Sequence, residues 1–136
     1  MFLLDTNVVS ELRKTKPHGA VVAWLSTVDS DQIAVPAVVI GEIQAGIEMT
    51  RSQNPSRAIE IEGWLEIILA SHSVVPMDAA IFREWARLIH KKQDNLVLDA
   101  MIAATAKVMA ATVVTRNIHD FKGLGVEVFN PFTYKA

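Results

Sequence analysis

Three carboxylates in this sequence stand at positions where a charged group is unusual. Asp5 directly follows a short apolar run, Glu42 lies inside an otherwise apolar helical stretch, and Asp99 is the one acid among residues 96–106. Carboxylate oxygens without cysteine partners suit Mg²⁺ or Mn²⁺. Such ions clamp phosphates and activate water for phosphodiester hydrolysis. We therefore expect a metal site built from these three acids.

A fourth polar position follows the apolar run at residues 112–114. Asn117 and Asp120 lie just beyond it, where a strand's carboxyl end would present them to a ligand. Asn and Asp are also usual turn residues. The sequence leaves open whether Asn117, Asp120 or both complete the site.

Each acid also has a purely structural interpretation. Asp5 is a good helix cap, and Asp99 is either the cap of its helix or a ligand in the first turn, where the helix N-terminus favours the ionised form. Glu42 lies one turn from Val38 and Val39, near the core face. A carboxylate there is costly unless it is paired or metal-bound, and an Arg partner is the ordinary alternative.

Composition sets the broad class of the protein. The chain has 136 residues, 51% of them apolar, with 21% charged residues, a net charge of −2 and no cysteine. We expect a single globular domain over residues 1–136 without disulfides or thiolate metal sites. No apolar stretch approaches the length of a signal peptide or a membrane span, so a cytoplasmic protein is expected. The slight negative charge argues weakly against a passive nucleic-acid coat.

Short strand-like runs alternate along the chain with longer stretches of helical periodicity. This alternation predicts a three-layer α/β/α sandwich with a mostly parallel central sheet. Ligands bind such sheets at the carboxyl ends of the strands, where the strand order reverses. The predicted strands cover residues 2–4, 33–35, 74–75, 112–114 and 126–129, and the predicted helices cover 21–28, 38–46, 59–68, 81–89 and about 98–110.

Basic residues near the proposed acids are candidate phosphate contacts, although a solvated helix face is the usual role of such residues. They are Arg13, Lys14, Lys16 and Arg116. The three tryptophans fall at helical core spacing, and we interpret them as packing residues. No Gly-rich phosphate loop, G-x-S-x-G elbow or H-E-x-x-H motif is present.

Five segments together resemble the motifs of PIN-domain toxins of the VapC and FitB type. The resemblance extends over nearly the whole chain, with the motifs in the family's order and spacing. Each motif alone is weak, but the set is specific. The segments are residues 3–11, 41–47, 99–106, 115–121 and 128–132.

The resemblance implies a Mg²⁺-dependent endoribonuclease that acts on RNA as the toxin of a toxin–antitoxin pair. It implies that Asp5, Glu42 and Asp99 hold the metal, and that the chain forms a homodimer silenced by a cognate antitoxin. Members often carry a fourth acid where this chain has Asn117, and many carry a glycine where residues 93–95 have none.

Two other interpretations compete with this one. A receiver-like signalling domain is a similar-sized α/β fold with an acidic pocket. It requires a phospho-accepting Asp after the third strand, for which Asp78 is available, together with paired acids after the first strand and a Lys after the last. Asp5 has no acidic neighbour, however, and no Lys is well placed. A catalytically inactive, RNA-binding PIN domain is the second alternative, and the intact acids argue against it.

Overall fold

The central element is a parallel five-stranded sheet in the order β3-β2-β1-β4-β5. The computed structural model describes residues 1–90, 92 and 96–136, and the predicted loop difference at residues 93–95 lies outside them. The strand order reverses between β1 and β4, whose carboxyl ends lie side by side. The strands are β1 (Phe2–Leu4), β2 (Ile33–Pro36), β3 (Ser73–Val75), β4 (Thr112–Val114) and β5 (Val128–Phe129).

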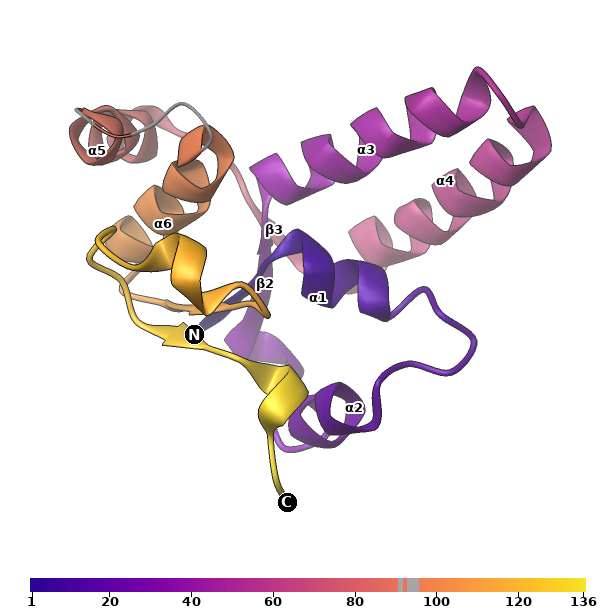
Figure 1. Cartoon of the computed structure of the whole chain (residues 1–136), viewed down its shortest axis with the longest axis horizontal. Helices are drawn as coiled ribbons and strands as arrows, with labels where there is room; N and C mark the ends of the chain where they lie inside the picture. Colours follow the sequence, from indigo (N-terminus) through magenta and orange to yellow (C-terminus); the bar gives the residue numbers. More distant parts are fainter. Residues whose placement is uncertain (91, 93–95) are drawn as a thin grey trace.

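Helices cover both faces of the sheet. Figure 1 shows α5 and α6 on the left of the sheet and α1, α3 and α4 on the right. This arrangement follows from right-handed crossovers, because the chain moves outward from β1 to β3 and then returns past β1 to β4. It confirms the predicted three-layer α/β/α sandwich. The helices are α1 (Thr6–Glu11), α2 (Gly19–Leu25), α3 (Ala37–Arg51), α4 (Pro55–Ser71), α5 (Ala79–Ile89) and α6 (Val97–Met109), with short turns η1 (Ser30–Gln32), η3 (Ile118–Phe121) and η4 (Pro131–Thr133).

The core is formed where the middle strands are covered on both sides. Leu3, Leu4 and Val114 are fully buried, as expected for apolar strands of a parallel sheet between two helical layers. Trp24 packs edge-on against Phe2, with ring centroids 5.2 Å apart. This burial confirms the predicted packing role for that tryptophan.

The predicted helices are present, with ends that differ by a few residues. The helix predicted over residues 21–28 begins at Gly19 and ends at Leu25, and the one predicted over 38–46 continues to Arg51. The short helix α1 was not predicted, because six residues are too few to show a helical period. Within the described residues, no helix combines the length and apolarity needed to cross a membrane.

Candidate active site

The candidate site lies where the strand order reverses, at the carboxyl ends of β1 and β4. Asp5 is the first residue after β1, and its backbone N–H donates to the carbonyl of Val114, the last residue of β4. Thr115 therefore stands directly beside Asp5. This is the crevice that open parallel sheets use for ligands.

Asp5 is buried and held by three hydrogen bonds. Its Oδ1 accepts from the Thr6 backbone N–H at 2.7 Å, which caps α1, and its Oδ2 accepts from the Thr115 hydroxyl at 2.7 Å and from Asn7 Nδ2 at 3.1 Å. Burial raises the pKa of Asp5, and these hydrogen bonds partly offset that effect. Asp5 is thus both a helix cap and a member of the site, so its two interpretations are compatible.

Thr115 is the residue that orients this end of the site. Its hydroxyl donates to Asp5 and accepts from Asn7 Nδ2 at 3.1 Å and from the Asn117 N–H at 3.0 Å. Asn7 in turn accepts from the Arg116 N–H at 3.0 Å. The sequence pattern alone did not single out Thr115. The available signal was a hydroxyl residue immediately after a predicted strand.

Glu42 reaches the site from the second turn of α3. Burial raises its pKa, and the negative charge of Asp5 raises it further. Glu42 forms no ion pair within the part of the chain that the structure describes, so the alternative of an Arg partner is not supported. The Thr6 side chain lies beside Glu42. The Thr6 hydroxyl is buried and makes no hydrogen bond to any described residue.

Asp99 projects from the first turn of α6, three residues after the capping residue Leu96. It is therefore not the cap of its helix. Burial, followed by the charges of Asp5, Asp120 and Glu42, raises the pKa of Asp99 to about 6. Asp99 thus lies within electrostatic range of the other three acids, although they come from distant parts of the sequence.

The fourth position differs between Asn117 and Asp120. Asp120 lies on η3, and its charge raises the pKa of both Asp5 and Asp99. Asn117 directly precedes η3 without a side-chain capping bond, and its backbone N–H donates to Thr115 while the residue is exposed. The structure therefore brings the charge of Asp120 into the acidic cluster, which we define as Asp5, Glu42, Asp99 and Asp120.

The acidic cluster has the donor chemistry that a hard divalent cation requires. Its four carboxylates form no ion pair with any described basic residue, and each of three raised pKa values reflects burial and neighbouring negative charge. The unpartnered Thr6 hydroxyl adds a further oxygen next to Glu42. Among the described residues, no three His, Cys, Asp or Glu side chains stand in a ready-formed metal geometry. Coordination would therefore draw these side chains closer together.

The predicted phosphate contacts are dispersed around this edge of the sheet. Arg116 stacks on Phe132 with its guanidinium carbon 3.7 Å from the ring centroid. Lys14 pairs at 3.0 Å with Glu11, a buried carboxylate that also accepts from the His18 N–H at 2.9 Å. Arg13 and Lys14 line a separate cavity, and Lys16 is exposed.

Asp78, on which a receiver-like phosphotransfer would depend, has a different role. Its Oδ1 accepts from the Ile81 N–H at 2.9 Å and so caps α5. It follows β3, which is the edge strand of the sheet, and it does not contribute to the raised pKa values of the acidic cluster. Asp78 is therefore a helix-capping residue that lies outside the acidic cluster.

Comparisons with known proteins agree on one family. The model of the PIN domain matches residues 2–125. Toxin FitB of Neisseria gonorrhoeae is 33% identical over 139 residues, covering 97% of this chain and 99% of the relative. VapC ribonuclease Y4jK of Sinorhizobium fredii is 31% identical over 138 residues, covering 97% and 98%. The crystal structure of FitAcB from Neisseria gonorrhoeae matches with a TM-score of 0.84 at 31% identity, over 98% of this chain and 99% of that chain.

Proposed function

The chain belongs to the PIN-domain family, and on that premise we propose that it is a magnesium-dependent endoribonuclease that acts as a toxin. The observation that carries the proposal is the acidic cluster at the strand-order reversal, which has no basic partner among the described residues. Relatives of nearly equal length named as a toxin and as a ribonuclease support it. A receiver-like function is abandoned, because the family is different.

Asp5, Glu42 and Asp99 would hold the metal, with Asp120 acting through a bound water. Mg²⁺ or Mn²⁺ there would supply charge stabilisation for a phosphodiester and an activated water for its hydrolysis. The chain's own contribution is orientation, because Thr115 and Asn7 hold the Asp5 carboxylate in place through hydrogen bonds to Oδ2.

The proposal extends to partners and location. A relative that is a toxin implies a cognate antitoxin that silences this chain, and RNA as the substrate. A cytoplasmic homodimer is the expected working form, in line with the family resemblance. Light scattering of the purified chain, alone and with its antitoxin, measures both associations.

The direct test is to incubate the purified protein with total RNA in millimolar Mg²⁺ or in EDTA and to sequence the new ends. We expect cleavage with Mg²⁺ and none with EDTA. The matched variants are Asp99→Asn, in the acidic cluster, and Asp31→Asn, an exposed acid before β2 at the opposite edge of the sheet. RNA that is bound but never cut, with either metal, would instead identify an inactive RNA-binding PIN domain.

A further inference from the structure

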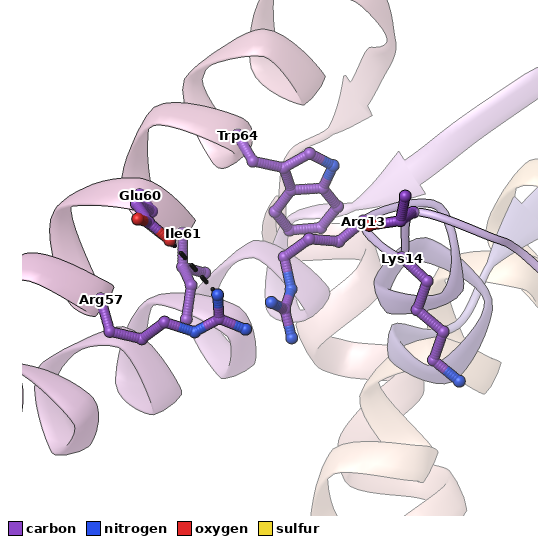
Figure 2. Close-up of a pocket in the computed structure, with 7 residues that line it drawn as sticks. Arg13, Lys14, Arg57, Glu60, Ile61 and Trp64 are labelled. Atoms are coloured by element: carbon purple, nitrogen blue, oxygen red, sulfur yellow. Dashed lines mark hydrogen bonds and ion pairs between the residues drawn. The ribbon is translucent and has the colours of Figure 1, made fainter.

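A second charged region lies away from the acidic cluster, at the far end of α1. It is a surface cavity of about 450 Å³ between the segment that follows α1 and the outer face of α4. Arg13 and Lys14 line one side, and Arg57, Ile61 and Trp64 line the other (Figure 2). No member of the acidic cluster lines it.

The cavity is positive in a chain whose net charge is negative. Three basic residues line it against one acid, Glu60. Figure 2 shows the guanidinium groups of Arg13 and Arg57 turned toward the same space from opposite sides. Two like charges that face each other across a cavity repel, and an anion between them relieves this repulsion.

Existing ion pairs leave this charge largely available. Arg57 pairs with Glu60 at 3.3 Å, but both side chains are at least half exposed, and such pairs are weak. Arg13 pairs with no carboxylate among the described residues. Lys14 is the exception, because Glu11 already holds its ammonium group.

Trp64 gives the cavity an aromatic wall. The indole is only half-buried against the core, and it forms no aromatic pair with any described ring, in contrast to Trp24 and Trp85. The packing role predicted for the tryptophans is thus incomplete at this position. Single-stranded nucleic acid binds to such a combination of an indole surface and two neighbouring guanidinium groups. The phosphate contacts the cations and the base stacks on the ring.

The cavity and the acidic cluster are joined by two helices. Asp5 caps the start of α1 and Arg13 follows its end, and six helical residues span about 9 Å. On the other side, Glu42 lies on α3, which is tied to α4 by the Gln44–Glu62 hydrogen bond of 2.8 Å. A single-stranded RNA that runs across the acidic cluster and along α1 would therefore reach the cavity.

We propose that this cavity binds one nucleotide of the RNA strand away from the scissile bond, with its phosphate between Arg13 and Arg57 and its base against Trp64. The inference rests on the proposed ribonuclease function and adds a second point of substrate contact to it. A volume of about 450 Å³ lies in the usual range for small-ligand sites and suits a single nucleotide. The site selects single-stranded RNA, since a paired base cannot reach the indole.

The test measures binding of a fluorescent single-stranded oligouridylate in EDTA, where no cleavage is expected. The variants are Arg13→Gln with Arg57→Gln, Trp64→Leu, and the matched control Arg83→Gln, an exposed arginine of α5 on the other face of the sheet. We expect the double variant to lose about tenfold or more in affinity and to lower the salt dependence of binding by about one neutralised phosphate. Trp64→Leu should lose about fivefold or more, and only for RNA that carries bases, not for a base-free ribose-phosphate chain of equal length.

Several results overturn the proposal. The proposal fails if the cavity variants bind RNA with the same affinity as Arg83→Gln, provided that their melting temperatures match that of wild type. Two other results would assign the cavity to an acidic protein segment. One is that Trp64→Leu loses equal affinity for RNA and for the base-free chain. The other is full competition by an oligoglutamate peptide of matched charge. Because binding is read without metal, RNA that binds through the cavity but is never cut with Mg²⁺ refutes only the nuclease function. RNA that is cut equally well by wild type and pocket variants at limiting protein refutes only the cavity.

Discussion

The carboxylates at the two ends of α3 have opposite electrostatic surroundings. At the outer end, Glu48 and Glu62 share Arg51, with contacts of 3.0 and 2.9 Å, and hydrogen bonds from Arg51 and Gln44 lower the pKa of both acids. At the inner end, burial raises the pKa of Glu42 and of its neighbour Asp99. The outer acids are paired with a basic residue of the chain itself, whereas the inner acids have no basic partner among the described residues.

The largest expected difference between the two ends is catalytic. Asp99→Asn keeps the side-chain shape and removes one metal-binding charge, so cleavage should fall by about a hundredfold or more. Glu62→Gln removes a carboxylate of the outer network and should leave the rate unchanged. Single-turnover cleavage of one labelled RNA by both variants makes the comparison. Equal activity of the two proteins would remove the distinction on which the proposed function depends.

The second difference concerns the stability of the metal-free protein. The pKa of Asp99 rises from 3.8 to about 6 on folding, so the folded state binds this proton more tightly than the unfolded state. The corresponding stability is present below about pH 4 and is lost as the pH rises through 6, by about 2 to 3 kcal/mol. Asp99→Asn removes this loss, so the free energy of unfolding of the variant should exceed that of wild type by an amount that grows between pH 4 and pH 7.

Urea unfolding in EDTA across this pH range measures the effect. The Glu62→Gln control should show the opposite sign, because the lowered pKa of Glu62 stabilises the fold above pH 4.5 and ceases to do so as the pH falls. A constant difference between Asp99→Asn and wild type would mean that the inner acids are solvated like ordinary surface carboxylates.

A smaller effect is expected for the residue that orients the acidic cluster. Thr115→Val keeps the volume but removes the hydroxyl that donates to Asp5 and accepts from Asn7 and Asn117. The loss of these buried contacts should cost about 1 to 2 kcal/mol in unfolding free energy. It should also raise the Mg²⁺ concentration needed for half-maximal cleavage, since Asp5 loses its orientation. Thr115→Ser should restore the metal dependence, whereas failure of that rescue would leave Thr115 with a packing role alone.

The smallest effect separates the two residues of the fourth position. Asp120→Asn removes a charge that acts on Asp5 and Asp99, so it should raise the Mg²⁺ requirement by several-fold, on the order of 1 kcal/mol. Asn117→Ala should change it less, because Asn117 serves Thr115 through its backbone. Metal titrations of cleavage by the two variants decide between them. A larger effect of Asn117→Ala would mean that its amide oxygen, and not Asp120, completes the site.

The sequence predicted the fold well because strand and helix patterns alternate strongly. Apolar runs located the strands, and the fold class followed from their alternation with helices. The short helix α1 escaped because its six residues carry no period. Its start is marked by the Asp5 cap, a role that the residue type suggested, but a capping residue alone does not show that a helix follows it.

The members of the acidic cluster could be predicted from the sequence, but the residues that contact them could not. Asp5, Glu42 and Asp99 stand out as acids in apolar surroundings. In the structure burial and the charge of Asp5 raise the pKa values of Glu42 and Asp99, while the role of all three as metal ligands stays a prediction. Glu42 has no ion-pair partner among the described residues, and this depends on how α3 packs, which sequence spacing does not specify. The role of Thr115 depends on strand order, since β1 and β4 are neighbours although 110 residues separate Thr115 from Asp5.

The central claim, that the acidic cluster binds a divalent cation, is tested most directly by titrating the protein with Mn²⁺ and recording the free ion by electron paramagnetic resonance. Wild type should bind Mn²⁺ at millimolar or lower concentration, with competition by Mg²⁺. Asp99→Asn should bind at least tenfold more weakly, while Glu62→Gln should bind like wild type. Binding that Asp99→Asn leaves intact, or that Glu62→Gln weakens equally, would contradict the claim.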